Sequence, residues 1–206
     1  PLNKMGACIQ SNNGHLPLII SSSNIDAIDY TMPVASAQVK SSIIFASLGS
    51  DRQTVIREKI KTRDHTEIML KYLGVGISNG KSIRIDPMKN ELTPFEITIP
   101  GDPSSAAFYA AAAAMIPNSD LTIKNLLANP TRTCFFSILE KMGTKVSWSN
   151  MRNEMGELVG DVHIYSQPLN GLNISDEMIP LIIDEIPIIA VLATQADSPT
   201  IIKGAQ

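Results

Sequence analysis

Three copies of one short phrase divide the chain at regular intervals. They read Leu-Asn-Lys-Met-Gly at residues 2–6, Leu-Lys-Tyr-Leu-Gly at 70–74 and Leu-Glu-Lys-Met-Gly at 139–143, so that their glycines are 68 and 69 residues apart. Each phrase is typical of a helix end, where Gly takes a left-handed conformation, and a strand-like run follows each one. The interval is too long for a solenoid turn, and it predicts one α+β module that was copied along the chain.

A second element repeats with the same spacing. Residues 33–48 and 100–115 each predict a turn and then a helix, with Ser36 and Ser104 in equivalent positions 68 residues apart. A third copy at 180–193 comes late, which indicates an insertion between 150 and 160. Short strands are expected at 53–57, 97–99, 121–124, 162–165 and 200–203, and hairpin turns at 12–14 and 79–80. The fold class is therefore α/β, with small sheets covered by helices.

The composition is that of a packed globular chain. Of its 206 residues, 44% are hydrophobic and 18% are charged, and the net charge is −3 without a long basic run. Nucleic acid and acidic membranes are therefore poor partners, and no apolar run is long enough to span a membrane. Cys8 and Cys134 belong to no recognisable motif and there is no secretory leader, so we expect a cytoplasmic protein. The chain starts inside an expected helix and stops just after an expected strand, so we expect a piece of a longer protein.

No pattern in the chain predicts a metal or a cofactor. The three histidines, His15, His65 and His163, have no metal-ligand spacing among themselves or with the cysteines. There is also no Gly-rich phosphate loop and no nucleophilic serine motif. We therefore expect neither a metal ion nor a nucleotide cofactor.

The helix that begins near Ser36 offers groups that bind anions. A helix N-terminus presents backbone N–H groups without helical partners and the positive end of the helix dipole. Ser36 adds a hydroxyl, Gln38 adds an amide, and Lys40 follows Ser36 by one turn on the same helix face. These residues predict either a phosphate site or a capped helix with a solvated lysine.

Two Thr-Arg pairs precede helices at equivalent places in successive modules. Thr62-Arg63 and Thr131-Arg132 are 69 residues apart. Arg63 can clamp a phosphate or a carboxylate, or it can pair with a nearby acid on the surface, whereas the repetition favours a structural cap. Asp102 is followed by Pro103, which is the composition of a helix start, and we expect it to be a helix cap.

Asp184 and Glu185 interrupt an apolar run. Two carboxylates in such a place are costly unless they cap a helix, pair with a cation or face a cleft. In a cleft, a carboxylate can bind a hydroxyl group and accept its proton. Capping of a helix that begins here is the alternative.

Five phrases, taken in order, resemble one known family. They are Pro-Val-Ala-Ser-Ala-Gln-Val-Lys-Ser at 33–41, Thr-Arg-Asp-His-Thr-Glu at 62–67, Pro-Gly-Asp-Pro-Ser-Ser-Ala-Ala at 100–107, Asn-Pro-Thr-Arg-Thr at 129–133 and Ile-Asp-Glu-Ile-Pro-Ile at 183–188. The family is that of 5-enolpyruvylshikimate-3-phosphate (EPSP) synthase, the target of glyphosate. The Ser-Ala-Gln form at 36–38 is similar to the bacterial type that is associated with glyphosate tolerance. The resemblance extends over essentially the whole chain.

The resemblance implies a fold of two similar lobes with a substrate cleft between them. Each lobe contains three βαβαββ units with helices inside and sheets outside, which is the inside-out α/β barrel of the enolpyruvyl transferases. For this chain it implies that residues 1–98 form the second part of one lobe and residues 99–206 the first part of the other. The barrel is therefore expected to be partial here, and the full-length protein is expected to be a monomer.

The resemblance also implies a reaction. The family transfers the enolpyruvyl group of phosphoenolpyruvate to the 5-hydroxyl of shikimate-3-phosphate and releases phosphate, a step in aromatic amino-acid biosynthesis that needs no cofactor. Carried over by motif, Ser36 and the backbone of Ala37 would hold the shikimate phosphate. Gln38 would lie against the shikimate ring and phosphoenolpyruvate, and Arg63 would approach the shikimate side. Asp184 would bind shikimate hydroxyls and accept the proton. No role is carried over onto Lys40, Asp102, Arg132 or Glu185.

Two alternatives remain open. Members of the family are longer than this chain. The segments that supply most of their cations for phosphoenolpyruvate would lie outside these 206 residues, so we expect this piece alone to be inactive. The nearest alternative is the related transferase that acts on UDP-N-acetylglucosamine and uses a cysteine-bearing loop as its acid. Neither Cys8 nor Cys134 lies in such a pattern. The other alternative is a non-catalytic structural piece that binds shikimate-3-phosphate weakly or not at all.

Overall fold

The computed structural model describes residues 1–204, which divide into two compact units. The first unit is Pro1–Phe95 and the second is Glu96–Gln206. Each unit has an apolar core of its own. Within residues 1–204, no helix combines the length and the apolar character that crossing a membrane requires.

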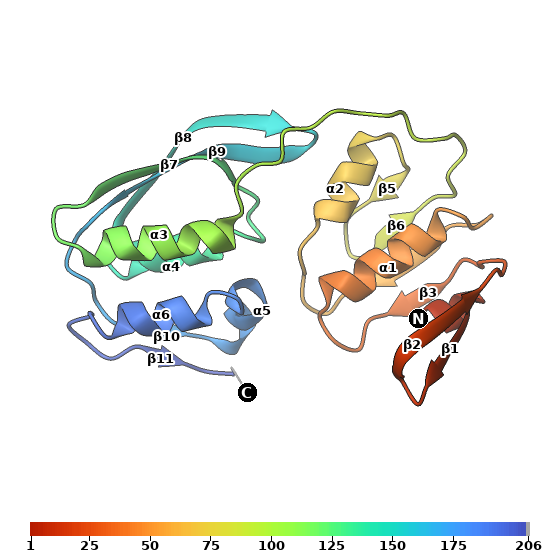
Figure 1. Cartoon of the computed structure of the whole chain (residues 1–206), viewed down its shortest axis with the longest axis horizontal. Helices are drawn as coiled ribbons and strands as arrows, with labels where there is room; N and C mark the ends of the chain where they lie inside the picture. Colours follow the sequence, from red (N-terminus) through yellow and green to blue (C-terminus); the bar gives the residue numbers. More distant parts are fainter. Residues whose placement is uncertain (205–206) are drawn as a thin grey trace. The chain divides into compact units, whose positions relative to one another are not determined.

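The first unit combines a hairpin, a four-stranded sheet and two α-helices (Figure 1). Strands β1 and β2 form the hairpin, and the sheet has the strand order β3-β4-β6-β5, with only β3 and β4 parallel. The elements are η1 (Leu2–Met5), β1 (Cys8–Asn12), β2 (His15–Ser21), β3 (Asp29–Thr31), α1 (Ala37–Ser47), β4 (Thr54–Arg57), α2 (His65–Tyr72), β5 (Ile77–Ser78) and β6 (Ile83–Ile85).

Helices α1 and α2 cover one face of this sheet. Along β6, Ile83 and Ile85 are buried while Arg84 between them is exposed, as expected for a strand with one covered face. Ile43 and Ile44 of α1 share the resulting core with these strand residues, as do the other members of the cluster: Met5, Met32, Ile56, Leu70, Val75 and Ile77. Because α1 and α2 both pack on this core, their first turns lie close to each other.

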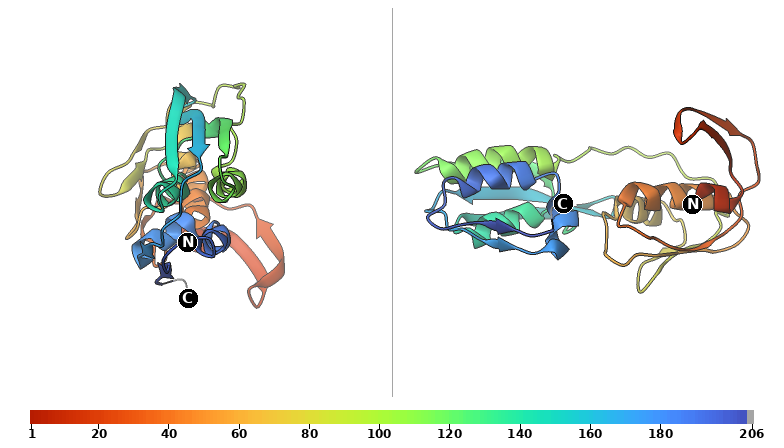
Figure 2. Two further views of the ribbon diagram at one scale, coloured as in Figure 1. Left: turned by 90° about the vertical axis from the view of Figure 1, so that its left-hand side faces the viewer. Right: turned by 90° about the horizontal axis from the view of Figure 1, so that it is seen from below.

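The second unit contains helices between two layers of strands (Figures 1 and 2). One layer is the antiparallel sheet β7-β9-β8, and the other is the parallel pair β10 and β11. The elements are α3 (Pro103–Met115), β7 (Asp120–Leu127), α4 (Cys134–Lys141), β8 (Lys145–Glu154), β9 (Glu157–Tyr165), β10 (Asn173–Ile174), η2 (Asp176–Met178), α5 (Ile179–Ile182), α6 (Ile186–Ala193) and β11 (Ile201–Ile202).

The alanine-rich helix α3 is central to the core of the second unit. Ala107, Ala110 and Ala111 are fully buried, and small side chains at these positions allow neighbouring backbones to approach closely. Phe136 of α4 contacts the ring of Trp148 on β8 edge to face, with ring centroids 5.5 Å apart. The alanine run therefore belongs to the apolar core of this unit.

The three repeated phrases end in the same backbone geometry. Gly6, Gly74 and Gly143 have φ values of 93°, 89° and 111°. In each copy the Gly N–H donates to the carbonyl three residues earlier, and the next N–H donates to the carbonyl five residues before it. This pair of bonds is a Schellman motif, so the predicted left-handed helix ends are confirmed at all three places.

Some predicted elements differ from the structure. The strand expected at 97–99 is absent, because residues 86–100 pair with no strand in the described part of the chain. The helix expected at 180–193 is divided by a turn at 183–185 into α5 and α6. The insertion expected at 150–160 coincides with the long β8–β9 hairpin, whose turn contains Met155 and Gly156 at positive φ. The hairpins predicted at 12–14 and 79–80 are confirmed.

Candidate functional site

Helix α1 begins as the sequence predicts. Ser36 is its N-cap, with an extended backbone, and its Oγ accepts a hydrogen bond of 3.3 Å from the Val39 N–H. Ala37 and Gln38 are the first two helical residues, and N–H groups at these positions have no partner within a helix. The Gln38 side chain is exposed. The capped-helix interpretation is therefore confirmed, and the capped turn still presents donors that an anion can use.

The Lys40 side chain does not lie where either sequence interpretation places it. Its side chain is fully buried, so it is neither a solvated lysine nor a group that faces a phosphate at the first turn of α1. Lys40 Nζ lies 2.8 Å from Glu67 Oε1 and 3.3 Å from Glu58 Oε2. The reason is the orientation of α1 about its own axis: the Lys40 side chain faces Glu58 after β4 and Glu67 of α2 instead of solvent.

The first turns of α1 and α2 border an open hollow of about 250 Å³. Arg63 lines it, and its lining also contains three residues from α1 and two from α2: Ala37, Gln38, Ser41, His65 and Thr66. The Ser41 and Thr66 hydroxyls are 2.8 Å apart and join the two helices beside it. Arg63 is the basic residue of this set, and none of the six is acidic. The hollow therefore has the charge that suits an anion.

The structure brings three of the five predicted site residues together. Ala37, Gln38 and Arg63 line the hollow, and Ser36 is the residue before Ala37. Asp184 belongs to the second unit. Sequence reasoning overlooked Ser41, whose contribution follows only from its bond to Thr66. His65 and Thr66 were visible as part of the 62–67 phrase but had no assigned role.

Asp184 and Glu185 differ in their exposure, although they are neighbours in the chain. Asp184 is exposed in the turn between α5 and α6, whereas the Glu185 side chain is buried. Glu185 occupies the N-cap position of α6 without making a side-chain cap bond, and its Oε1 instead accepts a bond of 2.5 Å from the Ser104 hydroxyl. The prediction that this pair caps a helix is therefore wrong for the Glu185 side chain. Through its bond to Ser104, Glu185 instead anchors the turn that carries Asp184.

The bond from Ser104 continues into a larger network. Arg132 donates to Asp102 Oδ1 at 2.5 Å and to Ser104 Oγ at 2.9 Å, so it joins the start of α3 to the segment before α4. Asp102 caps α3 by accepting from the Ser105 N–H at 2.9 Å, as predicted. Burial opposes ionisation of Asp102, but the bonds from Ser105 and the charge of Arg132 outweigh it and lower its pKa. Sequence reasoning gave Arg132 a capping role alone and missed the connection to Glu185.

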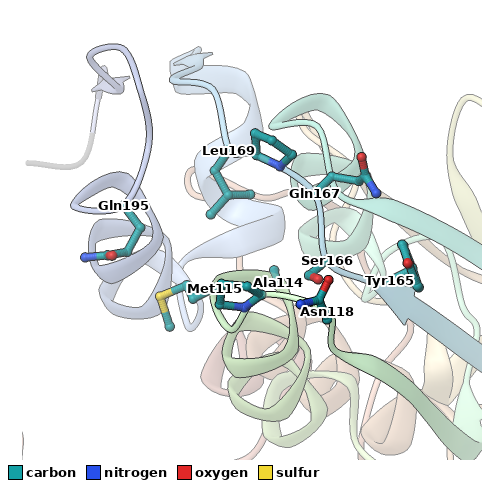
Figure 3. Close-up of a pocket in the computed structure, with 10 residues that line it drawn as sticks. Ala114, Met115, Asn118, Tyr165, Ser166, Gln167, Leu169 and Gln195 are labelled. Carbon is teal, nitrogen blue, oxygen red and sulfur yellow. The ribbon is translucent and has the colours of Figure 1, made fainter.

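A second hollow, of about 390 Å³, lies elsewhere in the second unit (Figure 3). Half of its lining residues lie at or just after the C-terminal ends of α3 and α6, such as Met115, Asn118 and Gln195, and the other half are residues 165–169 at and after the end of β9. Asp102 and Asp184 precede the opposite ends of these helices. None of the ten described residues that line this hollow is charged, so it lacks the groups that hold a phosphate or move a proton.

Comparison with known proteins identifies the family of this chain. The family model described as EPSP synthase (3-phosphoshikimate 1-carboxyvinyltransferase) matches residues 1–206. The chain belongs to the EPSP synthase family. The 3-phosphoshikimate 1-carboxyvinyltransferases of Oceanobacillus iheyensis and Bacillus subtilis are 46% and 44% identical to it, over 209 and 207 residues. All of this chain aligns with them, but it spans about half of their length, 48% in each case.

Solved structures agree with the family assignment. An EPSP synthase structure from Acinetobacter baumannii superposes with a TM-score of 0.87 at 36% identity, covering 98% of this chain and 46% of that one. The enolpyruvyl transferase NikO from Streptomyces tendae has a TM-score of 0.68 at 17% identity, with 98% and 49% covered, and therefore shows the fold alone. The predicted fold class is confirmed: the chain has part of the α/β fold that EPSP synthase shares with another enolpyruvyl transferase.

Proposed function

We propose that the whole protein transfers the enolpyruvyl group of phosphoenolpyruvate to the 5-hydroxyl of shikimate-3-phosphate, giving EPSP and phosphate. The observation that carries this proposal is the match of all 206 residues to the EPSP synthase family. The same match gives no support to UDP-N-acetylglucosamine as the acceptor. Because the chain spans about half of its relatives, the activity is proposed for the complete protein and not for this piece.

The hollow of the first unit is the proposed site for the shikimate phosphate. Ser36 and the Ala37 backbone would hold the phosphate at the start of α1, and Gln38 would contact the ring and phosphoenolpyruvate. Arg63 would provide a cation from the start of α2, where its planar guanidinium can form two parallel bonds to an oxyanion. The absence of acidic side chains among the six lining residues supports this assignment.

Asp184 is the proposed proton acceptor. Transfer to the 5-hydroxyl requires that this hydroxyl lose its proton as the new C–O bond forms, and a carboxylate within hydrogen-bonding reach can take it. Asp184 is exposed, whereas Glu185 is buried and bonded to Ser104. This difference supports a catalytic role for Asp184 and a structural one for Glu185.

Three further proposals follow from the family. Residues 1–98 would form the second part of one lobe, and residues 99–206 the first part of the other. The complete protein would be a cytoplasmic monomer. No metal or cofactor would take part, and within residues 1–204 no three His, Cys, Asp or Glu side chains gather in a way that would hold a metal ion.

The reaction is tested in a full-length protein in which this chain replaces the 207-residue segment that it matches in the Bacillus subtilis relative. We expect release of inorganic phosphate that depends on both shikimate-3-phosphate and phosphoenolpyruvate. Asp184→Asn should lower kcat by roughly a hundredfold or more, the usual contribution of a general base. Phosphate release with UDP-N-acetylglucosamine in place of shikimate-3-phosphate would contradict the proposed acceptor.

A control variant separates the roles of the two neighbouring carboxylates. Glu185→Gln keeps an oxygen that can accept the Ser104 hydroxyl, so its effect on kcat should be far smaller than that of Asp184→Asn. Equal losses in the two variants would mean that Asp184 has no special part in proton transfer.

A further inference from the structure

Lys40 is the centre of a charged cluster in the interior of the first unit. Its Nζ contacts Glu67 Oε1 at 2.8 Å, Glu58 Oε2 at 3.3 Å and the Thr62 carbonyl at 3.5 Å. The side chains of Lys40, Glu67 and Glu58 are 0%, 2% and 11% exposed. We refer to Lys40, Glu58, Thr62 and Glu67 as the Lys40 cluster. Buried charges are costly even when paired, so stability alone is a weak explanation for such a group.

Within the cluster, Lys40 and Glu58 together bind every polar group of Thr62. The Thr62 N–H donates to Glu58 Oε1 at 3.2 Å, and the Thr62 hydroxyl donates to the same oxygen at 2.5 Å. The Thr62 carbonyl accepts from Lys40. Because Thr62 directly precedes Arg63, the backbone that enters Arg63 is fixed to α1 through Lys40 and to the end of β4 through Glu58.

A second link lies on the other side of Arg63. The Ser41 and Thr66 hydroxyls are 2.8 Å apart and connect α1 to α2 three residues after Arg63. Arg63 is therefore held between two attachments, and both of them reach α1. That helix also carries Ala37 and Gln38, which line the same hollow as Arg63.

Charge attraction does not explain the cluster. It contains one cation and two carboxylates, so its ionised form carries net negative charge beside a hollow that suits an anion. Burial raises the pKa of Glu67, and the bond from Lys40 opposes this shift. A cluster meant to attract phosphate would have the opposite balance of charge.

We propose that Lys40, Glu58 and Thr62 are positioning residues, which fix Arg63 relative to the first turn of α1 so that both meet the same phosphate group. The proposal rests on the proposed function, because it takes the hollow to be the phosphate site. It predicts that Arg63 is already ordered before a ligand binds. A preorganised arginine loses less freedom on binding, which strengthens the interaction.

The test uses the 206-residue chain labelled with ¹⁵N and observed by NMR. Shikimate-3-phosphate is titrated while the Ala37 and Gln38 amides and the Arg63 Nε–Hε group are followed. The heteronuclear NOE of Arg63 Nε–Hε, recorded without ligand, reports the order of its side chain. Shikimate and inorganic phosphate are titrated separately to distinguish recognition of the ring from recognition of the phosphate.

Two pairs of variants separate position from charge and from packing. Thr62→Val removes the hydroxyl that donates a hydrogen bond to Glu58, and Thr62→Ser keeps it. Glu58→Ala removes the accepting carboxylate, and Glu58→Gln keeps one oxygen that can accept. Thr131→Val is the matched control, because buried Thr131 makes the equivalent pair of bonds to Asn129 Oδ1 in the second unit.

We expect Thr62→Val and Glu58→Ala to weaken binding by roughly tenfold, the size of one bond to a charged group, and to lower the Arg63 NOE. Thr62→Ser, Glu58→Gln and Thr131→Val should stay within about twofold of the unaltered chain. Tighter binding by Glu58→Ala, or an unchanged Arg63 NOE in Thr62→Val, would overturn the proposal. If neither this chain nor the full-length hybrid with the Bacillus subtilis relative binds shikimate-3-phosphate, the phosphate site of the proposed function fails. The Arg63 NOE in the variants still decides whether the cluster orders Arg63.

Discussion

Asp102 connects a helix start to a distant arginine. It caps α3 through the Ser105 N–H and also pairs with Arg132, whose side chain reaches Ser104 as well. Its pKa is lowered from 3.8, since these partners outweigh the effect of burial. A lowered pKa in the folded state means that Asp102 stabilises the fold above about pH 3.8, and that this contribution is lost as the pH falls through the lower folded-state pKa.

Asp102→Asn should therefore reduce stability at pH 7 and have no such effect in acid. Asn caps helices as well as Asp does, so the variant loses the charge but keeps the cap. We expect a loss below about 1 kcal/mol at pH 7, since the Asp102 carboxylate is nearly half exposed. Urea unfolding followed by the fluorescence of Trp148, the single tryptophan, measures this in the second unit. A difference that persists at pH 2 would show that the charge of Asp102 is not responsible.

Individual residues also show where sequence reasoning stops. Helix caps were predictable at Ser36 and Asp102, because cap preference is a local property of the chain. The burial of Lys40 was not, since Lys40 follows Ser36 by one turn and only the packing of α1 on β4 decides which way it faces. The burial of Glu185 beside exposed Asp184 likewise depends on Ser104, 81 residues earlier in the chain.

The Schellman helix ends test how strongly the repeated glycines are required. A Cβ added at Gly74 would meet no atom within 4 Å, whereas one at Gly143 would lie 2.7 Å from the Pro168 carbonyl oxygen. Both have positive φ, which costs a residue with a side chain roughly 1–2 kcal/mol. Gly143→Ala adds the clash with Pro168 to this cost.

We therefore expect Gly74→Ala to destabilise the first unit by roughly 1–2 kcal/mol and Gly143→Ala to destabilise the second unit by more. Hydrogen exchange of the core amides, resolved by residue, measures the two units separately. A smaller effect at Gly143 than at Gly74 would mean that the segment around Pro168 moves away without cost.

Regular elements with strong local signals were the most predictable part of the fold. The glycine helix ends and the Asn-Gly hairpins follow from backbone preferences that act within a few residues. Residues 97–99 are of types that suit a strand, but they pair with no strand in the described chain. The sequence could not show this, because strand pairing depends on distant partners. The two Thr-Arg pairs were correctly aligned, but only the structure shows that the N–H and the hydroxyl of each threonine both donate to one side-chain oxygen.

On the scale of the whole chain, two separate cores predict two independently protected units. Residues 86–100 have no helix or strand, and residues 88–99 are all exposed. Lys89 is the one basic residue in that segment, so trypsin should cut after it before it cuts elsewhere. Mass spectrometry of a brief digest should find two large fragments.

Lys89→Gln should slow this first cut without changing the stability of either unit. Early cleavage inside α3 or α1 in place of the 86–100 segment would contradict the division into two units. The family resemblance predicted a boundary close to this segment, although local composition alone did not indicate one.

The burial of Lys40 makes its amine a chemical reporter. An acylating reagent modifies exposed lysines such as Lys71 and Lys89 in the folded chain, but it reaches Lys40 only when the core of the first unit opens. The extent of acylation at this one amine would then record how often that unit opens in a mixture, in a crude extract or on a surface, without any measurement of the second unit.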